Sequence, residues 1–459
     1  MRRTGLFLLL LAVMCLSRTG RAAETNTLTW NTTSDQVSAD LHNEHLFPLL
    51  LAIAHQTGWH IFVEPEADRT VSVKFKNNDS GDALHKLLGN LNFALVPKTD
   101  EPWNLYVFVT RMENATRPVL AEKKPVVAGK QKHVPNQLMV KIRKGANIDA
   151  IAKSIGAKVV GRDDKLGVYL LEFPDAAATD AALARLQNYS DVQSVAYNNI
   201  YDPPPTPQLY SGNAPAQPSL TLDPSNQGNP CSPVIALIDT TWQPTGTSLD
   251  QFALKPISVV GNLTQPTAMT HSTAMYQTIL NAIAQSSGGH TSAKIQPVEV
   301  FGADGTANDW DVALGIQAAV DSGAGVLNMS LGGTSESPVL ADVVNQATAD
   351  GIVIFAAAGN QPVNTPTYPA AIPGVNAVTA LGAPGQLASY ANYGNFVSMA
   401  LPGASVVNYA GQSWLVQGTS PATAYATGVA VGTKGVNCAS WSQIEGAMQQ
   451  KFPVPQGQQ

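Results

Sequence analysis

From residue 232 onward, short apolar runs rich in β-branched residues alternate with segments of helical periodicity. Short buried runs of this kind, separated by amphipathic helices, are typical of a parallel sheet packed against helices. The pattern therefore predicts an α/β domain with a parallel sheet. The apolar runs are PVIALI, KIQPVEV, GVLNMS and IVIFAAA, and the helical segments are Ala274–Ala284, Trp310–Val320, Val339–Ala349 and the stretch after Ser420.

Two smaller modules precede this domain. Residues 37–110 alternate strand-like and helical runs, which predicts a small α+β module. Residues 137–197 follow the order βαββαβ, which predicts a ferredoxin-like module. Residues 111–133 are rich in Pro, Ala and Lys and lack apolar periodicity, so we expect a linker between the modules.

The first residues have the three parts of a secretory signal. Two arginines precede the apolar run Leu6–Leu16, and small residues follow near position 20. The run is shorter than the roughly 18 residues of a membrane anchor. We therefore expect an exported protein.

Only 13% of all residues are charged and the net charge is -6, so the composition offers no electrostatic basis for binding nucleic acid.

Three cysteines are present, and one of them, Cys15, falls within the expected signal. The exported chain would keep Cys231 and Cys438. Two cysteines in an exported protein can form a disulfide, but the sequence leaves open whether these two meet. The histidines of the first module are scattered over helix and loop without metal-ligand spacing, so no metal site is expected there.

Three polar residues follow apolar strands of the last domain directly: Asp239, Ser330 and Asn360. In a parallel sheet, functional sites lie at the carboxyl ends of the strands. No Gly-rich phosphate-binding fingerprint follows any of these strands, which argues against a nucleotide-binding domain. We therefore expect these three side chains at one edge of the sheet.

The stretch GTSPATAYATG, residues 418–428, offers a candidate nucleophile. Ser420 precedes Pro421, a residue favoured at the first helical position, so we expect Ser420 at a helix N-cap. After residue 202 the only histidines are His271, which opens a helical pattern, and His290, which lies in an apparent loop. Asp239 could orient His271, which would complete a nucleophile, base and carboxylate in the order Asp, His, Ser.

The motifs IALIDTT, HSTAMYQTI and GTSPATA resemble the aspartate, histidine and serine motifs of subtilisin-like serine proteases. The segments NMSLGG, AAAGN and YPAAIPGVNAVTA extend the resemblance in order along the chain. It implies that Ser330, Leu331 and Gly332 bind substrate and that Asn360 donates to the oxyanion. The resemblance also implies that the second module is a propeptide, whose tail from Asn198 to Tyr210 occupies the active-site cleft.

Several positions depart from the family motifs. Thr241 stands where the aspartate motif has glycine, and Ser272, Ala274 and Gln277 replace the first glycine, second histidine and last glycine of the histidine motif. Calcium is a common family cofactor, but the acidic residues of 302–311 lack the alternation of a calcium loop. We expect Asn308 or Asp309 to cap a helix instead, and no cofactor is assigned.

The segment VSADLHNEHLFPLLLAIAHQTGWHIFVEP resembles the secretin and TonB short N-terminal domain. That resemblance implies a periplasmic or secreted protein of a Gram-negative bacterium, with an envelope partner bound through residues 35–110. The resulting domain boundaries are 1–22 (signal), 35–110, 111–133 (linker), 134–202 (propeptide), 203–230 (Pro-rich linker) and 231–459 (protease domain).

The sequence thus predicts an exported serine endopeptidase made as an autoinhibited proenzyme, with polypeptide substrates. The alternative is a catalytically impaired binding protein with the same fold, which the altered histidine motif favours and the retained triad disfavours. An esterase would require a G-x-S-x-G elbow with histidine last in the sequence, and this chain has neither.

Overall fold

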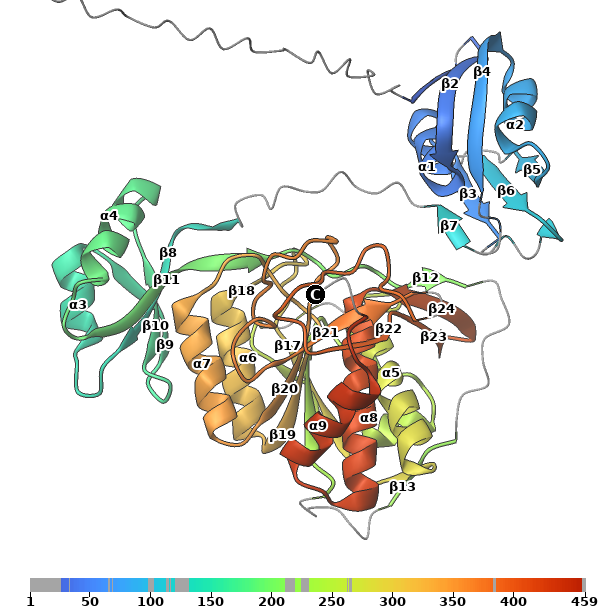
Figure 1. Cartoon of the computed structure of the whole chain (residues 1–459). Coiled ribbons are helices and arrows are strands. Elements are labelled where there is room, and N and C mark those ends of the chain that lie inside the picture. Colours follow the sequence, from blue (N-terminus) through green and yellow to red (C-terminus); the bar gives the residue numbers. More distant parts are fainter. Residues whose placement is uncertain are drawn as a thin grey trace, which may run out of the picture. The chain divides into compact units, whose positions relative to one another are not determined.

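The computed structural model describes residues 26–32, 34–64, 67, 69–97, 103–112, 115, 117–119, 132–210, 219–223, 231–261, 263, 266–382 and 385–455 (Figure 1). The expected signal at 1–22 and most of the expected linker at 111–133 lie outside these residues. The chain divides into two compact units, Met1–Lys123 and Lys124–Gln459. Within the described ranges, no helix has the length and apolar character needed to cross a membrane.

In its described residues, the first unit has two sheets and two α-helices, with strand orders β1-β2-β4 and β5-β6-β3-β7. Its core includes Leu50, Ile53, Leu84 and Leu87, all fully buried. The second helix is capped by the Asp79 side chain, which accepts from the Asp82 N–H. The elements are β1 (Thr27–Asn31), β2 (Gln36–His45), α1 (Leu46–Thr57), β3 (His60–Val63), β4 (Thr70–Asn78), α2 (Ser80–Leu88), β5 (Asn92–Val96), β6 (Asn104–Phe108) and β7 (Arg117–Val119).

The second unit begins with one sheet and two helices in the order βαββαβ. The sheet has the strand order β11-β8-β10-β9, and its pairings are antiparallel. A short strand of the following domain, β18 (Ala307–Asn308), extends the sheet beyond β11. The elements are β8 (His133–Ile142), α3 (Ile148–Ile155), β9 (Lys158–Asp163), β10 (Val168–Glu172), α4 (Ala176–Leu186) and β11 (Val192–Tyr201).

The last domain is built on a seven-stranded sheet of order β15-β17-β14-β19-β20-β21-β22, in which every pairing is parallel. The helices lie on both faces: α6 and α7 cover one, and α5 and α8 the other (Figure 1). The strands are β14 (Val234–Asp239), β15 (Ile257–Ser258), β17 (Lys294–Glu299), β19 (Ala324–Met329), β20 (Val353–Ala357), β21 (Asn376–Leu381) and β22 (Met399–Pro402).

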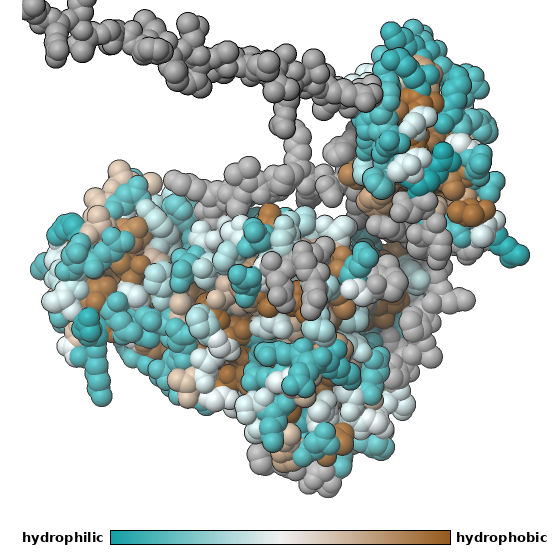
Figure 2. All heavy atoms as spheres, viewed as in Figure 1, coloured by the Kyte–Doolittle hydropathy of each residue, from teal (hydrophilic) through white to brown (hydrophobic). Residues whose placement is uncertain are grey.

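The remaining elements of this domain surround the sheet. The long helices are α5 (His271–Ser287), α6 (Asp309–Asp321), α7 (Pro338–Ala349), α8 (Thr419–Asn437) and α9 (Trp441–Lys451). The shorter elements are β12 (Gln208–Leu209), β13 (Thr221–Leu222), the 3-10 helix η3 (Ser248–Phe252), β16 (His290–Thr291), β23 (Ala404–Tyr409) and β24 (Gln412–Gln417). On the face shown in Figure 2, hydrophilic side chains predominate at the surface and apolar ones appear in patches between them.

Helices α5 and α8 pack in close contact because α8 presents small residues to α5. A Cβ atom at Gly428 would lie only 2.4 Å from the carbonyl oxygen of Ile279, so no side chain fits there. A Cβ at Gly432 would meet the Ser286 hydroxyl. This packing matters for function, because His271 begins α5 and Ser420 lies in the first turn of α8.

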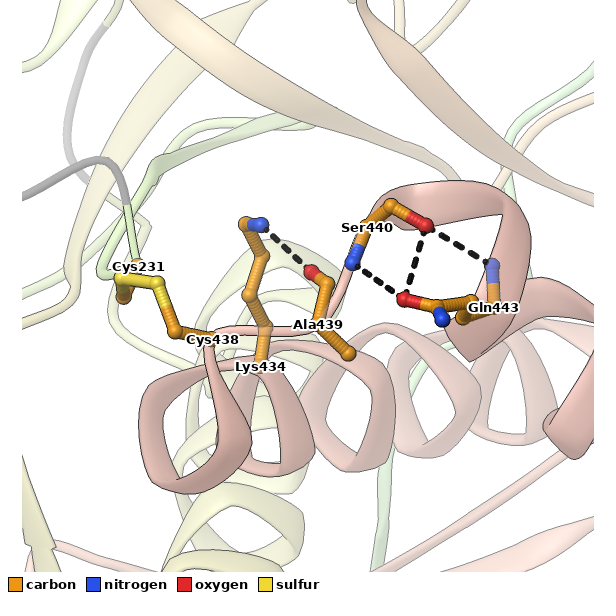
Figure 3. The surroundings of a disulfide bond; sticks show 6 residues. All are labelled: Cys231, Lys434, Cys438, Ala439, Ser440 and Gln443. Atoms are coloured by element: carbon orange, nitrogen blue, oxygen red, sulfur yellow. Dashed lines mark hydrogen bonds between the residues drawn. A yellow bond between two sulfur atoms is a disulfide. The ribbon is translucent and has the colours of Figure 1, made fainter.

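A disulfide joins Cys231 to Cys438, 207 residues apart in sequence, with their Cα atoms 4.8 Å apart (Figure 3). The sequence left this pairing open. The bond connects the start of the last domain to the end of α8. Beside it, the Lys434 ammonium donates to the carbonyl of Ala439 at 3.0 Å, and Ser440 begins α9 with a capping box. Figure 3 shows these contacts grouped at the junction of α8 and α9.

Candidate active site

Asp239 and His271 form a buried pair at the carboxyl end of the sheet. The two carboxylate oxygens of Asp239 lie 2.8 and 2.9 Å from Nδ1 of His271, and the residues are 1% and 3% exposed. Since a carboxylate only accepts hydrogen bonds, Nδ1 carries the proton and Nε2 of a neutral ring is unprotonated. Nε2 is buried and has no hydrogen-bond partner among the described residues.

Local structure fixes the direction of this pair. Asp239 is the last residue of β14, and its Oδ1 also accepts from the backbone N–H of Thr240 at 2.7 Å. Thr270 caps α5, so the ring of His271 projects from the first residue of the helix. The side chain of Gln243 accepts from the Thr270 N–H at 2.9 Å and so holds the cap in place. No sequence motif pointed to this role for Gln243.

Ser420 lies inside the first turn of α8 and not at its N-cap, so that expectation is wrong. The helix begins at Thr419, and Gly418 is the N-cap with φ of 146°, a value that favours glycine. The Asn360 side chain accepts from the Thr419 N–H at 2.8 Å and thereby takes over the capping. The Ser420 hydroxyl is therefore not engaged in capping its own helix.

The hydroxyl of Ser420 is 3.3 Å from the carbonyl oxygen of Ser330, to which it donates. The Ser330 hydroxyl in turn donates to the Ser420 carbonyl at 3.4 Å. Ser420 is 4% exposed. The structure therefore brings Asp239 to His271 and Ser420 to Ser330. Nε2 of His271 has no partner among the described residues, so Ser420 and His271 are not hydrogen-bonded to each other.

Asn328 anchors this part of the site, although the sequence did not single it out by chemistry. It is fully buried in β19, and its amide nitrogen donates to the Ser330 hydroxyl at 3.0 Å. Its amide oxygen accepts from the Thr427 hydroxyl at 2.9 Å. Asn328 thus connects the end of β19 to α8. The sequence signal that could have indicated this role is a polar residue inside an otherwise apolar strand.

Asn360 has the geometry of a hydrogen-bond donor toward the site. Its Oδ1 accepts from both the N–H and the hydroxyl of Thr419, at 2.8 and 3.1 Å. These two bonds assign the oxygen end of the amide, so the Nδ2 end is the donor. The preceding Gly359 has a φ of 108°, and a Cβ there would lie 2.5 Å from the Asn392 amide. Glycine is therefore required where the chain turns into Asn360.

The expected substrate-binding segment, Ser330 to Gly332, follows β19 directly. Leu331 is 6% exposed, and a Cβ at Gly332 would lie 2.7 Å from the Thr367 methyl group. Gly333 exchanges backbone hydrogen bonds with Tyr368, which closes one side of this segment. His290, the other histidine of the domain, is exposed in β16, as expected for a surface residue.

Glu299 is a second carboxylate beside the pair, and sequence reasoning missed it. It ends β17 and stands opposite Asp239 in the register of the parallel strands. Burial raises its pKa above the usual range, although hydrogen bonds from the Trp242 N–H and the Ser258 hydroxyl oppose that rise. Within the described residues, no three His, Cys, Asp or Glu side chains gather as ligands for a metal ion.

The expected helix cap near residue 308 is Asn308, whose side chain accepts from the Asp311 N–H at 3.0 Å. Asp309 is instead fully buried. Burial raises the pKa of Asp309 to about 6, while hydrogen bonds from Tyr201 and Asn199 work in the opposite direction.

Two parts of the chain match known protein families. Residues 232–452 match the model of the subtilase family, and residues 121–198 match that of the fervidolysin N-terminal prodomain. Over 156 residues the chain is 36% identical to subtilisin BL of Lederbergia lenta, covering 34% of this chain and 58% of that protein. It is 36% identical over 156 residues to M-protease of Shouchella clausii, covering 34% and 41%. The chain spans about half the length of these curated relatives.

Among solved structures, fervidolysin from Fervidobacterium pennivorans, a keratinolytic enzyme related to subtilisin, has a TM-score of 0.54 at 22% identity. The match covers 68% of this chain and 57% of that one, and it shows a shared fold. Residues 232–452 thus resemble the subtilase family, and the segment before them, residues 121–198, resembles the prodomain of fervidolysin.

Proposed function

We propose that this chain is an exported serine endopeptidase made as an autoinhibited precursor, with Asp239, His271 and Ser420 as its catalytic residues. The observation that carries the proposal is the buried Asp239–His271 pair, whose Nε2 has no partner in the described structure. An imidazole held in this tautomer is a general base awaiting a proton. The proton would come from Ser420, on the helix that packs against the histidine helix.

The reaction is acyl transfer. Nε2 of His271 takes the Ser420 hydroxyl proton as the oxygen attacks the peptide carbonyl, and Asp239 stabilises the imidazolium. The Nδ2 group of Asn360 and the Ser420 N–H donate to the oxyanion. His271 then gives its proton to the leaving amine, and a water molecule activated by the same ring releases the acyl group.

The course of the chain between the prodomain and the last domain supports autoinhibition. Tyr201 pairs with Ala307 of β18, and Gln208 pairs with Leu415 of β24, the strand that leads into the Ser420 turn. Residues 202–207, DPPPTP, therefore run from β18 toward the start of α8. A tail on this route would cross the end of the sheet where Ser420 lies, and the family resemblance implies such a course for a propeptide.

A ferredoxin-like arrangement of the prodomain is part of the proposal. Its basis is the order βαββαβ together with the strand order β11-β8-β10-β9. The proposal also retains an envelope-partner role for residues 35–110 and a periplasmic or secreted location, both based on the sequence resemblance and on the signal pattern at residues 1–22.

The test is labelling with a fluorophosphonate, which reacts with an activated serine, while the chain mass is followed over time. The wild type should become labelled on Ser420 and lose the region before about residue 210. Ser420→Ala and His271→Ala should do neither, whereas His290→Ala, which changes the exposed histidine of the same domain, should behave as wild type. A folded wild type that is neither labelled nor processed would favour the catalytically impaired binding protein.

A further inference from the structure

The last strand of the prodomain ends in a deeply buried tyrosine. Tyr201 is 2% exposed and pairs with Ala307 as β11 lies antiparallel against β18. The residue belongs to a buried apolar cluster that contains Phe301, Trp310 and Leu331 of the last domain and also prodomain residues such as Leu170. A residue of the prodomain thus fills a pocket of the last domain.

The polar end of this pocket is Asp309. The Tyr201 hydroxyl donates to its Oδ1 at 2.5 Å, and the Asn199 side chain donates to its Oδ2 at 2.8 Å. The Asn199 N–H adds a longer bond of 3.3 Å. From the last domain itself, the Ser337 side chain is the donor. Most of the donors to this fully buried carboxylate therefore come from the prodomain.

Other polar contacts between the prodomain and the last domain differ in their exposure. The Trp310 N–H donates to the Asn198 side chain at 3.1 Å in the buried interface, Ser194 donates to Asp342 at 2.7 Å in a partly buried contact, and Lys165 pairs with Asp321 at the surface. Exposed pairs contribute little free energy because water competes for both partners. The Tyr201–Asp309 hydrogen bond is shielded from water, so a side chain that cannot donate to Asp309 would bind more weakly in the place of Tyr201.

The position of the pocket relates it to the reacting bond. Tyr201, the last residue of β11, pairs with β18. Further along the chain, Gln208 pairs with β24, the strand that ends just before the Ser420 turn. An extended polypeptide that follows the same route would therefore present a side chain to Asp309 a few residues before the bond at Ser420. The prodomain strand shows how such a segment is held, through backbone pairing with β18 and one buried side chain.

We propose that Asp309 and the apolar residues around it form a substrate pocket that selects tyrosine, and that Tyr201 occupies this pocket in the precursor. This inference rests on the proposed function. Once the prodomain leaves, a buried carboxylate without its donors gains most from a ligand that restores a hydrogen bond. A phenol does so and a phenyl ring does not, so we expect about a tenfold to hundredfold preference for tyrosine over phenylalanine.

The test uses the product that remains after the region before about residue 210 has been lost, together with two synthetic peptides. Both have the sequence of residues 196–205, AYNNIYDPPP, and they carry Tyr or Phe at position 201. The readout is protection of Ser420 from fluorophosphonate labelling, which does not require peptide cleavage. The Tyr peptide should protect at a concentration about tenfold or more below the Phe peptide. An enzyme carrying Asp309→Asn, which keeps the size of the side chain, should lose most of this difference.

A second measurement uses the intact precursor and needs no maturation. Tyr201→Phe should raise the initial labelling rate of Ser420, because the prodomain tail is held less tightly. The matched control is Tyr197→Phe in the same strand, since Tyr197 donates to Asp180 within the prodomain, and its labelling rate should match the wild type. Equal protection by both peptides, or equal labelling of the two precursor variants, would overturn the inference. Absence of any labelling would refute the proposed function instead.

Discussion

Replacing Asp309 by asparagine should change how the stability of the precursor depends on pH. Asp309 is fully buried, and burial raises its pKa from 3.8 to about 6 despite the hydrogen bonds from Tyr201 and Asn199. Between these two values the folded chain holds a proton that the unfolded chain has lost. The free energy of unfolding therefore falls as pH rises through this window and stays level above it.

The magnitude follows from the size of the shift. A pKa raised from 3.8 to about 6 corresponds to about 3 kcal/mol of unfolding free energy lost between the acidic and the neutral end of the window. An asparagine does not titrate, so Asp309→Asn removes this contribution. The unfolding free energy of the chain that keeps Asp309, minus that of the Asp309→Asn chain, should therefore decline by about 3 kcal/mol from about pH 4 to about pH 7.

The assay is urea unfolding, followed by far-ultraviolet circular dichroism, at a series of pH values. Both chains carry Ser420→Ala so that self-cleavage does not interfere. Asp342→Asn controls for the loss of a carboxylate at the same interface, where Asp342 accepts from Ser194. A difference curve that is flat, or that rises with pH, would show that Asp309 is not a buried acid with a raised pKa.

Further predictions concern packing, the disulfide and the oxyanion donor. Gly428→Ala should lower the unfolding free energy by about 1–3 kcal/mol because its methyl would meet the Ile279 carbonyl, whereas Gly446→Ala, with open space around it, should raise it by about 0.5–1 kcal/mol; urea midpoints measure both. Replacing Cys231 and Cys438 by serine should remove about 5 kcal/mol, judged from the length of the closed loop, and lower the thermal midpoint. Asn360→Ala should reduce kcat by about a hundredfold to a thousandfold with little change in KM, measured on a peptide substrate.

The parallel sheet could be predicted from sequence because both of its faces are covered. Its strands are apolar throughout, so runs such as Val353–Ala357 stand out against the amphipathic helices between them. The end of β11 could not be predicted in the same way. Asn198 and Asn199 are poor strand formers, and they extend the strand because tertiary contacts satisfy their side chains. The Asn198 side chain accepts from the Trp310 N–H, and the Asn199 side chain donates to Asp309.

The candidate catalytic residues could be named from sequence, but the means of holding them could not. Asp239, His271 and Ser420 stand at recognisable places after a strand or at a helix start. The capping of α8 was mispredicted because it depends on Asn360, a residue about 60 positions away in sequence. Likewise Asn328 and Gln243 act through contacts that only the folded chain brings together.

The departures from the family histidine motif leave the Asp239–His271 pair in place. Gln277, which replaces a glycine, is buried, and its amide oxygen accepts from the Asn408 N–H at 3.3 Å, connecting α5 to β23. Ser272 is buried, and its backbone N–H donates to the Thr240 hydroxyl next to Asp239, a bond that a glycine would also make. Neither side chain contacts the Nδ1 face of His271, where the Asp239 carboxylate is bound. Gln277 therefore gives α5 a side-chain connection to β23, and the Asp239–His271 pair is kept.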